Sequence, residues 1–295
     1  MNTPTNSFKA GFVNIIGKPN VGKSTLLNTL IGQDLSVVNA KAQTTRHRIK
    51  AIINDTNYQI VFSDTPGIMK PAYKLHQKML DAVDETFTDA DIIMYVTEMR
   101  DTRPDEEWME KIKMMSVPKF IVINKMDTAT EPELHAAIDF WKTQNAWNEI
   151  IPISALHKFN TNLIIDKIVE YLPEGQPYFD DDKLTDRNDR FFVTEIIRER
   201  ILANYQKEIP YSVEVIVNSF KEEETIIRIQ ADILVERDSQ KGIIIGNKGE
   251  ALKYVGTKAR EEMEKFFAKK VFLELFVKVD KDWRSNENRL KNFGY

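Results

Sequence analysis

The chain has no cysteine among its 295 residues, which excludes both a disulfide-stabilised fold and a thiolate metal site. It also lacks any apolar run of the roughly 18 residues that a membrane-spanning helix needs. Residues 1–9 contain neither a basic segment followed by a long apolar one nor a tract rich in arginine and serine, so no secretory or organellar leader is predicted. These absences together predict a cytoplasmic protein.

A large excess of one charge is absent as well. The chain carries 41 basic and 45 acidic side chains, a net charge of −4, and this average does not indicate a strongly basic nucleic-acid-binding protein. Residues 237–270, however, hold nine basic and five acidic side chains, a local net charge of +4. A basic patch confined to this region is therefore a prediction.

At roughly 150 residues per domain, the length predicts two domains. Up to about Leu172, short apolar runs alternate with amphipathic stretches, a pattern typical of βαβ units. Strands are predicted at 12–16, 58–62, 92–96, 120–123 and 150–153, and helices at 24–31, 75–87, 105–115, 132–145 and 161–171. Residues 1–172 are thus expected to form an α/β domain with a doubly wound, mostly parallel sheet.

Residues 173–189, PEGQPYFDDDKLTDRND, have two prolines, a glycine and a cluster of acids, which is the composition of a solvated linker. Residues 190–295 are predicted to form a small α+β domain in the order helix, strand, strand, helix, helix, strand. Its elements are expected at 188–204, 212–219, 225–235, 249–267 and 271–279, with one short helix before a glycine-containing turn. Six apolar residues near the end are interpreted as core: Phe266, Phe267, Val271, Phe272, Leu273 and Phe276.

A phosphate-binding motif follows the first predicted strand. GKPNVGKS, from Gly17 to Ser24, fits G-x-x-x-x-G-K-[ST] and leads directly into a helix. Backbone N–H groups and the helix N-terminus would face the phosphates, Lys23 would reach the β- and γ-oxygens, and the Ser24 hydroxyl would bind Mg²⁺. The motif predicts a nucleoside triphosphate site but does not specify the base.

Three further motifs follow later predicted strands. Asp64-Thr65-Pro66-Gly67 places a carboxylate for Mg²⁺ and a glycine N–H for the γ-phosphate. Asn124-Lys125-Met126-Asp127 offers a carboxylate for the two N–H donors on the edge of guanine, and a buried Asp127 would be left unpaired against adenine. Ser154-Ala155-Leu156 can add a backbone N–H to guanine O6. The four motifs in this order predict a guanine nucleotide at the carboxyl edge of the sheet.

The residues predicted to contact the nucleotide are Gly17, Lys18, Pro19, Asn20, Val21, Gly22, Lys23, Ser24, Thr25, Asp64, Thr65, Pro66, Gly67, Ile68, Asn124, Lys125, Met126, Asp127, Ser154, Ala155 and Leu156. These motifs resemble the G1, G3, G4 and G5 motifs of the translation-factor-related GTPases, and Gln43-Thr44-Thr45-Arg46-His47 resembles their G2 segment. The resemblance implies Mg²⁺ ligation by Ser24, Asp64 and a threonine, either Thr44 or Thr45, with Thr45 preferred. It implies catalytic roles for Lys23, Thr45, Asp64 and Gly67.

Two departures from the Ras-like pattern concern the rate of hydrolysis. Ile68 stands where Ras-like proteins have a glutamine that orients water, so the intrinsic rate is expected to be slow. Asn20 occupies the position at which potassium-dependent GTPases use an asparagine to hold K⁺. Potassium stimulation is one hypothesis for Asn20, and a purely structural role in the loop is the alternative.

In the second predicted domain, Gly246-Asn247-Lys248-Gly249 lies between apolar residues and an amphipathic helix. Such a turn permits close approach of a sugar–phosphate chain, although G-x-x-G is a common sequence. With its nearby lysines it resembles the turn of a type II KH domain, which implies RNA contacts by Gly246, Asn247, Lys248, Gly249 and Lys253.

A GTPase domain followed by a type II KH domain resembles the Era family over nearly the whole chain. Segments 17–28, 41–47, 185–187, 209–213 and 293–295 carry the resemblance. It implies GTP hydrolysis with Mg²⁺, binding of the KH domain to 16S rRNA near its 3′ end, and a role in maturation of the small (30S) ribosomal subunit, with the nucleotide state gating RNA binding. A monomer is expected. The family resemblance also implies peripheral association with the inner face of the cell membrane. The alternative is a regulatory GTPase whose C-terminal domain binds a protein.

Overall fold

The structure is a computed structural model that describes residues 7–39, 41, 43–101, 104–144 and 146–295. Asn145, the expected end of one helix, lies outside the described residues, as do Ala42 and residues 1–6. Within the described part of the chain, no helix combines the length and the apolar character needed to cross a membrane.

The described chain divides into two compact units, which we call unit 1 and unit 2. Unit 1 comprises the described residues of Met1–Ser36, Thr45–Lys70 and Met79–Asp186. Unit 2 comprises those of Val37–Thr44, Pro71–Lys78 and Arg187–Tyr295. Two short segments from the N-terminal half of the sequence therefore pack as parts of unit 2.

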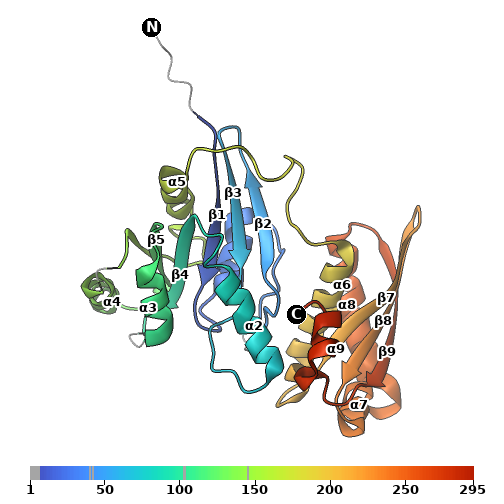
Figure 1. Ribbon diagram of the computed structural model, residues 1–295. Helices are drawn as coiled ribbons and strands as arrows, with labels where there is room; N and C mark the ends of the chain where they lie inside the picture. Colours follow the sequence, from blue (N-terminus) through green and yellow to red (C-terminus); the bar gives the residue numbers. More distant parts are fainter. Residues whose placement is uncertain (1–6, 40, 42, 102–103, 145) are drawn as a thin grey trace. The chain divides into compact units, whose positions relative to one another are not determined.

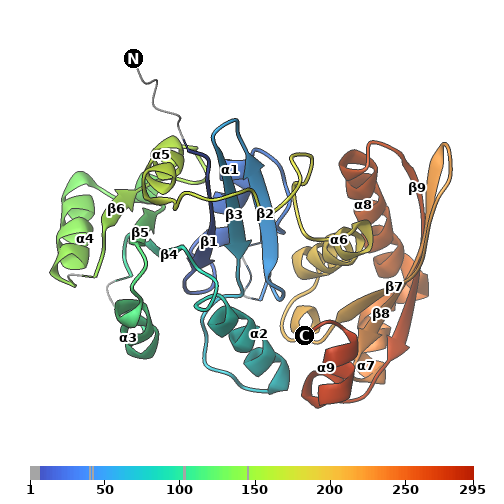
Figure 2. The ribbon, with the colours of Figure 1, turned by 45° about the horizontal axis from the view of Figure 1, so that its top comes forward.

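Unit 1 contains a six-stranded sheet in the order β2-β3-β1-β4-β5-β6 (Figures 1 and 2). All neighbouring strands run parallel except β2, which is antiparallel to β3. The strands are β1 (Lys9–Ile16), β2 (Ile49–Asn54), β3 (Tyr58–Asp64), β4 (Ile92–Glu98), β5 (Lys119–Asn124) and β6 (Glu149–Pro152). In this order β1 lies between β3 and β4, and the strand order reverses there. The carboxyl end of β1 is therefore at a topological switch point, where open α/β sheets bind their ligands.

Helices cover both faces of this sheet, so its strands are buried on both sides. Ile121 and Ile123 of β5 belong to a core formed with α2, α3 and α4, whereas the Phe120 ring packs on the other face against Tyr171 of α5, with 5.3 Å between ring centroids. The helices are α1 (Lys23–Ile31), α2 (Lys74–Glu85), α3 (Glu106–Met114), α4 (Glu131–Thr143) and α5 (Thr161–Tyr171). The predicted doubly wound α/β architecture is confirmed.

Unit 2 contains a three-stranded sheet in the order β7-β8-β9, with β7 and β8 antiparallel and β8 and β9 parallel. Its elements are α6 (Asp189–Asn204), β7 (Glu214–Glu222), β8 (Ile226–Val235), α7 (Asp238–Ile245), α8 (Glu250–Phe266), β9 (Lys270–Val279) and α9 (Glu287–Asn292). One face of the sheet packs on α6, α7 and α8, with Ile197, Ile229 and Ala259 fully buried between them. The predicted α+β order is confirmed.

The structure differs from the expectations in three places. Strand β2 and helix α9 were not expected from the sequence. Three residues interpreted as core, Phe266, Phe272 and Phe276, are exposed. Phe272 and Phe276 lie on the outer face of β9, which has no helix against it in the described chain, and Phe266 is the last residue of α8. Residues 173–186 are mostly exposed, as expected of a linker, yet Gln59 of β3 bonds to the backbone of Tyr178 and Phe179 and thereby fastens this segment to unit 1.

Candidate functional site

The loop between β1 and α1 carries the predicted phosphate-binding motif. Lys23 is the first residue of α1, is nearly fully buried, and donates from Nζ to the carbonyls of Gly17 (3.0 Å) and Lys18 (2.9 Å). Burial lowers the pKa of Lys23 to about 8, against the opposing attraction of Asp64. In the described chain, the hydrogen bonds of this buried cation go to neutral carbonyls and Asp64 offsets its burial only in part, which favours an anionic ligand in the loop.

Three oxygen-bearing side chains meet beside this loop. Ser24 Oγ donates to Asp64 Oδ2 over 2.7 Å, and Thr45 Oγ1 lies 3.0 Å from Ser24 Oγ and 3.3 Å from the same carboxylate oxygen. Burial raises the pKa of Asp64 and Lys23 opposes that shift. Asp64 Oδ1 is buried with no hydrogen-bond partner in the part of the chain that the structure describes. Two hydroxyls and a buried carboxylate with a spare oxygen are a donor set that fits Mg²⁺.

The structure separates the roles of the two adjacent threonines. Thr45 is buried and reaches Ser24 and Asp64, whereas Thr44 Oγ1 donates to the carbonyl of Lys41 over 2.6 Å. The preference for Thr45 as the metal ligand therefore has geometric support, and Thr44 has a local structural role.

The second motif lies at the end of β3. Thr65 is fully buried and its Oγ1 donates to the carbonyl of Ile15 in β1 over 2.7 Å. The N–H of Ile68 donates to the carbonyl of Gly17 over 3.1 Å, which keeps Gly67 against the phosphate-binding loop. The side chain of Ile68 is buried and has no polar group that could orient water, and the slow intrinsic rate stays a prediction.

The predicted guanine-binding residues also come together. Asn124 Nδ2 donates to the carbonyl of Val21 over 2.9 Å, and its Oδ1 accepts the N–H of Ala155 over 3.0 Å, so this side chain connects two of the motifs. Ser154 Oγ donates to Asp127 Oδ1 over 2.5 Å, and this bond, with burial opposing, lowers the pKa of Asp127. The prediction that Asp127 is buried is wrong for the protein without nucleotide, because Asp127 is exposed.

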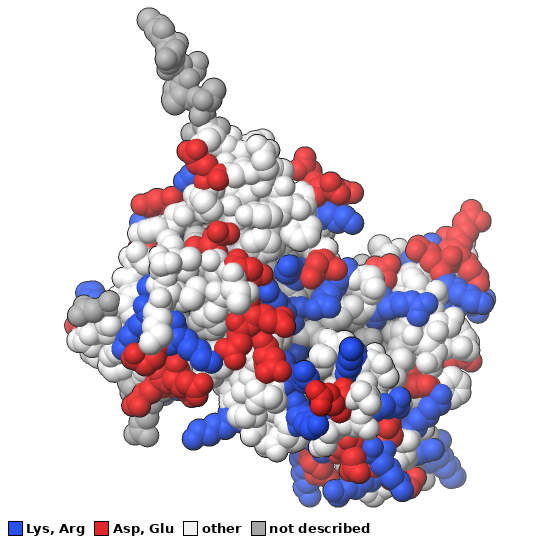
Figure 3. All heavy atoms as spheres, viewed as in Figure 1, with Lys and Arg blue, Asp and Glu red and all other residues white. Residues whose placement is uncertain are grey.

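The G-x-x-G turn of unit 2 joins α7 to α8. Asn247, Lys248 and Lys253 are exposed, as contact with RNA would require, and Tyr254 beside them is 53% exposed. Tyr254 was not predicted as a site residue, although an exposed aromatic next to a G-x-x-G turn is a surface on which a base can stack. On the face shown in Figure 3, Lys and Arg side chains are intermixed with Asp and Glu, so no single-sign patch covers that face.

Fold and motifs together define the class: a GTPase of the P-loop type whose chain continues into a KH domain. Residues 12–125 match the family described as 50S ribosome-binding GTPase, and residues 208–284 match the KH domain family.

The particular family follows from full-length relatives. GTPase Era of Syntrophus aciditrophicus is 48% identical over 292 residues, covering 98% of this chain and 95% of the relative. GTPase Era of Staphylococcus haemolyticus is 44% identical over 290 residues, covering 97% of each. The chain belongs to the Era family of GTPases.

Two solved Era structures match along nearly the whole chain. Era in complex with MgGDPNP and nucleotides 1506–1542 of 16S ribosomal RNA is 39% identical, with a TM-score of 0.93 and coverage of 98% of this chain and 99% of that one. A tyrosine-to-alanine variant of Aquifex aeolicus Era bound to GDP·AlF₄⁻ is 38% identical, with the same TM-score and coverage. The family resemblance expected from the sequence is confirmed.

Proposed function

We propose that this protein hydrolyses GTP and, in a manner set by its nucleotide, binds 16S rRNA near its 3′ end through the KH domain during maturation of the 30S subunit. The observation that carries the proposal is the match of the whole chain, both units included, to the Era structure that holds MgGDPNP and nucleotides 1506–1542 of 16S rRNA. The domains proposed for these tasks are 1–172 and 190–295, with 173–189 between them, and the proposed compartment is the cytoplasm.

Each group around the phosphate loop has a proposed role. Lys23 would stabilise charge on the β- and γ-phosphates, and Gly67 would offer its N–H to the γ-phosphate. Ser24, Thr45 and Asp64 would hold Mg²⁺, directly or through water. When bound, Mg²⁺ would neutralise the charge that develops on the phosphate oxygens. Asp127 would select guanine, because adenine lacks the two donors that a carboxylate accepts.

The absence of a polar group at Ile68 leaves the attacking water without a side-chain partner at that position. Asn20 is exposed in the loop with a φ of 63°, and we propose it as a ligand of K⁺. Equal hydrolysis rates in K⁺ and Na⁺ for the wild type, or an unchanged K⁺ effect in Asn20→Ala, would contradict this role.

The main test is binding of a short single-stranded RNA from the 3′ end of 16S rRNA, with GDP or GDPNP, at one fixed salt concentration. The variant is Asn247→Asp/Lys248→Asp, which adds a negative charge at one exposed position of the turn and reverses the charge at the other. Aspartate tolerates the left-handed conformation of Lys248, whose φ is 49°. We expect tighter binding of the wild type with GDPNP, and at least tenfold weaker binding of the variant.

The chain offers a matched control. Gln206→Asp/Lys207→Asp introduces the same charges at exposed positions of unit 2, and Lys207 has a φ of 55°. This control should bind RNA nearly as the wild type does. If neither nucleotide form of the wild type binds RNA, the alternative of a protein-binding C-terminal domain is favoured and only the GTPase part of the proposal stands.

A further inference from the structure

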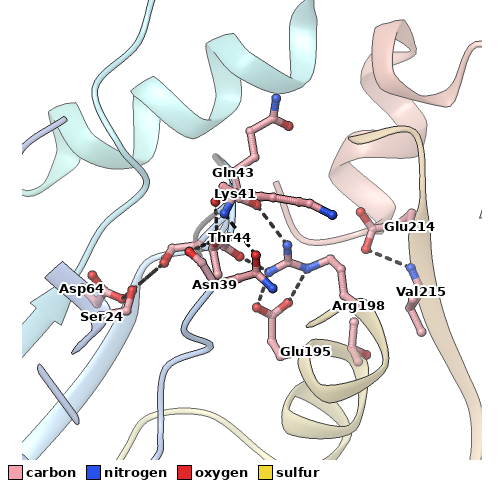
Figure 4. Close-up of polar contacts among 12 residues, drawn as sticks. Ser24, Asn39, Lys41, Gln43, Thr44, Asp64, Glu195, Arg198, Glu214 and Val215 are labelled. Atoms are coloured by element: carbon pink, nitrogen blue, oxygen red, sulfur yellow. Dashed lines mark hydrogen bonds and ion pairs between the residues drawn. The ribbon is translucent and has the colours of Figure 1, made fainter. Parts of the chain in front are cut away.

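A buried arginine on α6 holds the backbone just before Thr45. Arg198 and Glu195 are 1% and 4% exposed, and the Glu195 carboxylate accepts hydrogen bonds from Arg198 Nε (3.0 Å) and Nη2. The other side of the guanidinium donates to the carbonyls of Gln43 (3.1 Å) and Thr44 (Figure 4). Burial alone would lower the pKa of Arg198, but the adjacent carboxylate outweighs it and raises that pKa, so the guanidinium stays charged.

The same segment is fastened at a second point. Lys41 Nζ donates to the carbonyls of Leu202 and Tyr205, where α6 ends. A lysine ammonium at the C-terminus of a helix is favourable, because the unpaired carbonyls there carry partial negative charge. Arg198 and Lys41 together explain why Val37–Thr44 packs as part of unit 2.

Unit 2 gives way to unit 1 between Thr44 and Thr45. The Thr44 carbonyl that Arg198 holds and the Thr45 N–H belong to one planar peptide group. Thr45 Oγ1 in turn lies 3.0 Å from Ser24 Oγ and 3.3 Å from Asp64 Oδ2, as described above. The hydrogen bond from Arg198 to the Thr44 carbonyl therefore restricts the backbone of Thr45, the residue that would complete the Mg²⁺ site.

We propose that Arg198, oriented by Glu195, is a positioning residue for Thr45, so that the GTP-bound arrangement of the Mg²⁺ site depends on unit 2. This inference rests on the proposed GTPase function. A purely structural role explains the cluster less well. An ion pair buried on a helix adds little net stability, and apolar side chains of similar volume would pack as well. A guanidinium is required where two carbonyls and a carboxylate must be bonded together.

The test uses the full-length double variant Glu195→Gln/Arg198→Met. Removing Arg198 alone would leave a buried unpaired carboxylate and could unfold the protein, whereas the double variant is neutral and close in volume. Arg190→Met is the matched control, since Arg190 is exposed on the same helix and donates to the carbonyl of Val217.

Affinities for GDPNP and GDP are measured by calorimetry, with Mg²⁺ and with EDTA. We expect the gain in GDPNP affinity that Mg²⁺ provides to fall about tenfold in the double variant, as is typical when a residue behind a metal ligand is lost. GDP affinity should change less than twofold. Hydrogen exchange at residues 43–47 should become faster. Arg190→Met should match the wild type in all three measurements.

A double-mutant cycle with Thr45→Ala decides whether Arg198 acts through Thr45. If it does, adding Glu195→Gln/Arg198→Met to Thr45→Ala should not weaken GDPNP binding further, because the hydroxyl that Arg198 positions is already gone. Additive losses, or equal losses for GDP and GDPNP, would overturn the proposal. Failure of RNA binding in the wild type would contradict the proposed rRNA role and leave this cycle unaffected, so the two failures are distinguishable.

Discussion

Lys23 is a buried cation whose charge the folded chain compensates only in part. Its ammonium is buried against two backbone carbonyls, and its pKa is about 8 instead of 10.5. The charged form is therefore less stable in the folded chain than in the unfolded one. The phosphate loop is thus held in a form that costs stability until an anion binds, and this links the stability of the nucleotide-free protein to pH.

We predict that the free energy of unfolding of the nucleotide-free protein depends on Lys23 in a defined pH window. Below pH 8 both states hold the proton and the cost of burying the charge is constant. Between pH 8 and 10.5 the unfolded state binds more protons, so stability rises with pH. In this window the free energy of unfolding of the wild type should rise, relative to that of Lys23→Met, by up to about 1.4 kcal/mol per pH unit.

The measurement is urea unfolding at pH 7, 8, 9 and 10, followed by tryptophan fluorescence. Unit 1 holds three of the four tryptophans, Trp108, Trp141 and Trp147, so the signal is dominated by this unit. The contributions of other groups that titrate in this range are the same in the wild type and in Lys23→Met, so they cancel in the difference between the two. Lys18→Met, in the same loop, keeps Lys23 and should keep the pH dependence. Parallel curves for the wild type and Lys23→Met would contradict the assignment.

At the scale of elements, the turn between α7 and α8 has two glycines with different constraints. Gly246 has a φ of 72°, and a Cβ there would lie 2.6 Å from Ala251 Cβ. Gly249 has a φ of 82°, and a Cβ there would meet no described atom within 4 Å. Both positions favour glycine by backbone conformation, but only Gly246 is also limited by space.

We predict that Gly249→Ala costs about 1 kcal/mol of stability, the usual penalty of a left-handed conformation. Gly246→Ala should cost roughly 2–4 kcal/mol, because the overlap with Ala251 adds to that penalty. Urea unfolding of both variants, followed by circular dichroism, gives the difference. Equal losses would show that Ala251 moves aside at no cost. The larger expected loss is why the RNA experiment alters Asn247 and Lys248 and leaves Gly246 in place.

The elements that the sequence predicts well are those with a strong local signal. The phosphate loop, its strand and its helix follow from glycine spacing and an apolar run, and Asn124 and Asp127 follow from the end of another run. Strand β2 was missed, since its six residues directly follow the polar segment that contains Arg46 and His47. Helix α9 was missed because its six residues, ENRLKN, bury only Leu290.

Arg198 and Glu195 show a different limit. Charged residues three positions apart on a helix are usually accessible to solvent, and nothing local distinguishes this pair from the half-buried Lys258 and Glu261 on α8. Their burial depends on a segment more than 150 residues earlier in the chain. The sequence therefore predicts the groups that face the nucleotide but not the group that holds one of them in place.

For the whole molecule, the division into units does not follow the order of the chain. Val37–Thr44 and Pro71–Lys78 belong to unit 2, and the second boundary runs through helix α2. Arg284 lies over the Tyr73 ring, 4.7 Å from its centroid, and Lys74 pairs with Glu287 over 3.4 Å. The first of these segments directly precedes Thr45, and the second follows Gly67 by a few residues. The threonine expected to bind Mg²⁺ and the glycine expected to contact the γ-phosphate are therefore both close in sequence to parts of unit 2.

This partition predicts which core controls the local stability of the two segments. Met263→Ala removes a fully buried side chain from the core of unit 2, and Ile112→Ala does the same in unit 1. Each should destabilise its own unit by about 2–5 kcal/mol. Met263→Ala should speed hydrogen exchange in β8 and also in 37–44 and 71–78, because these segments lose their packing when unit 2 opens. Ile112→Ala should speed exchange in β4 and leave both segments near their wild-type rates.

Exchange measured by mass spectrometry in mild urea, without nucleotide, resolves these peptides. The two variants serve as controls for each other, since each removes a fully buried side chain from one unit only. If 37–44 and 71–78 respond to Ile112→Ala and not to Met263→Ala, both segments open with unit 1, and Arg198 cannot be the group that holds 37–44. If they respond to Met263→Ala, a change in the stability of the KH unit reaches the residues beside Thr45 and Gly67 through the chain itself.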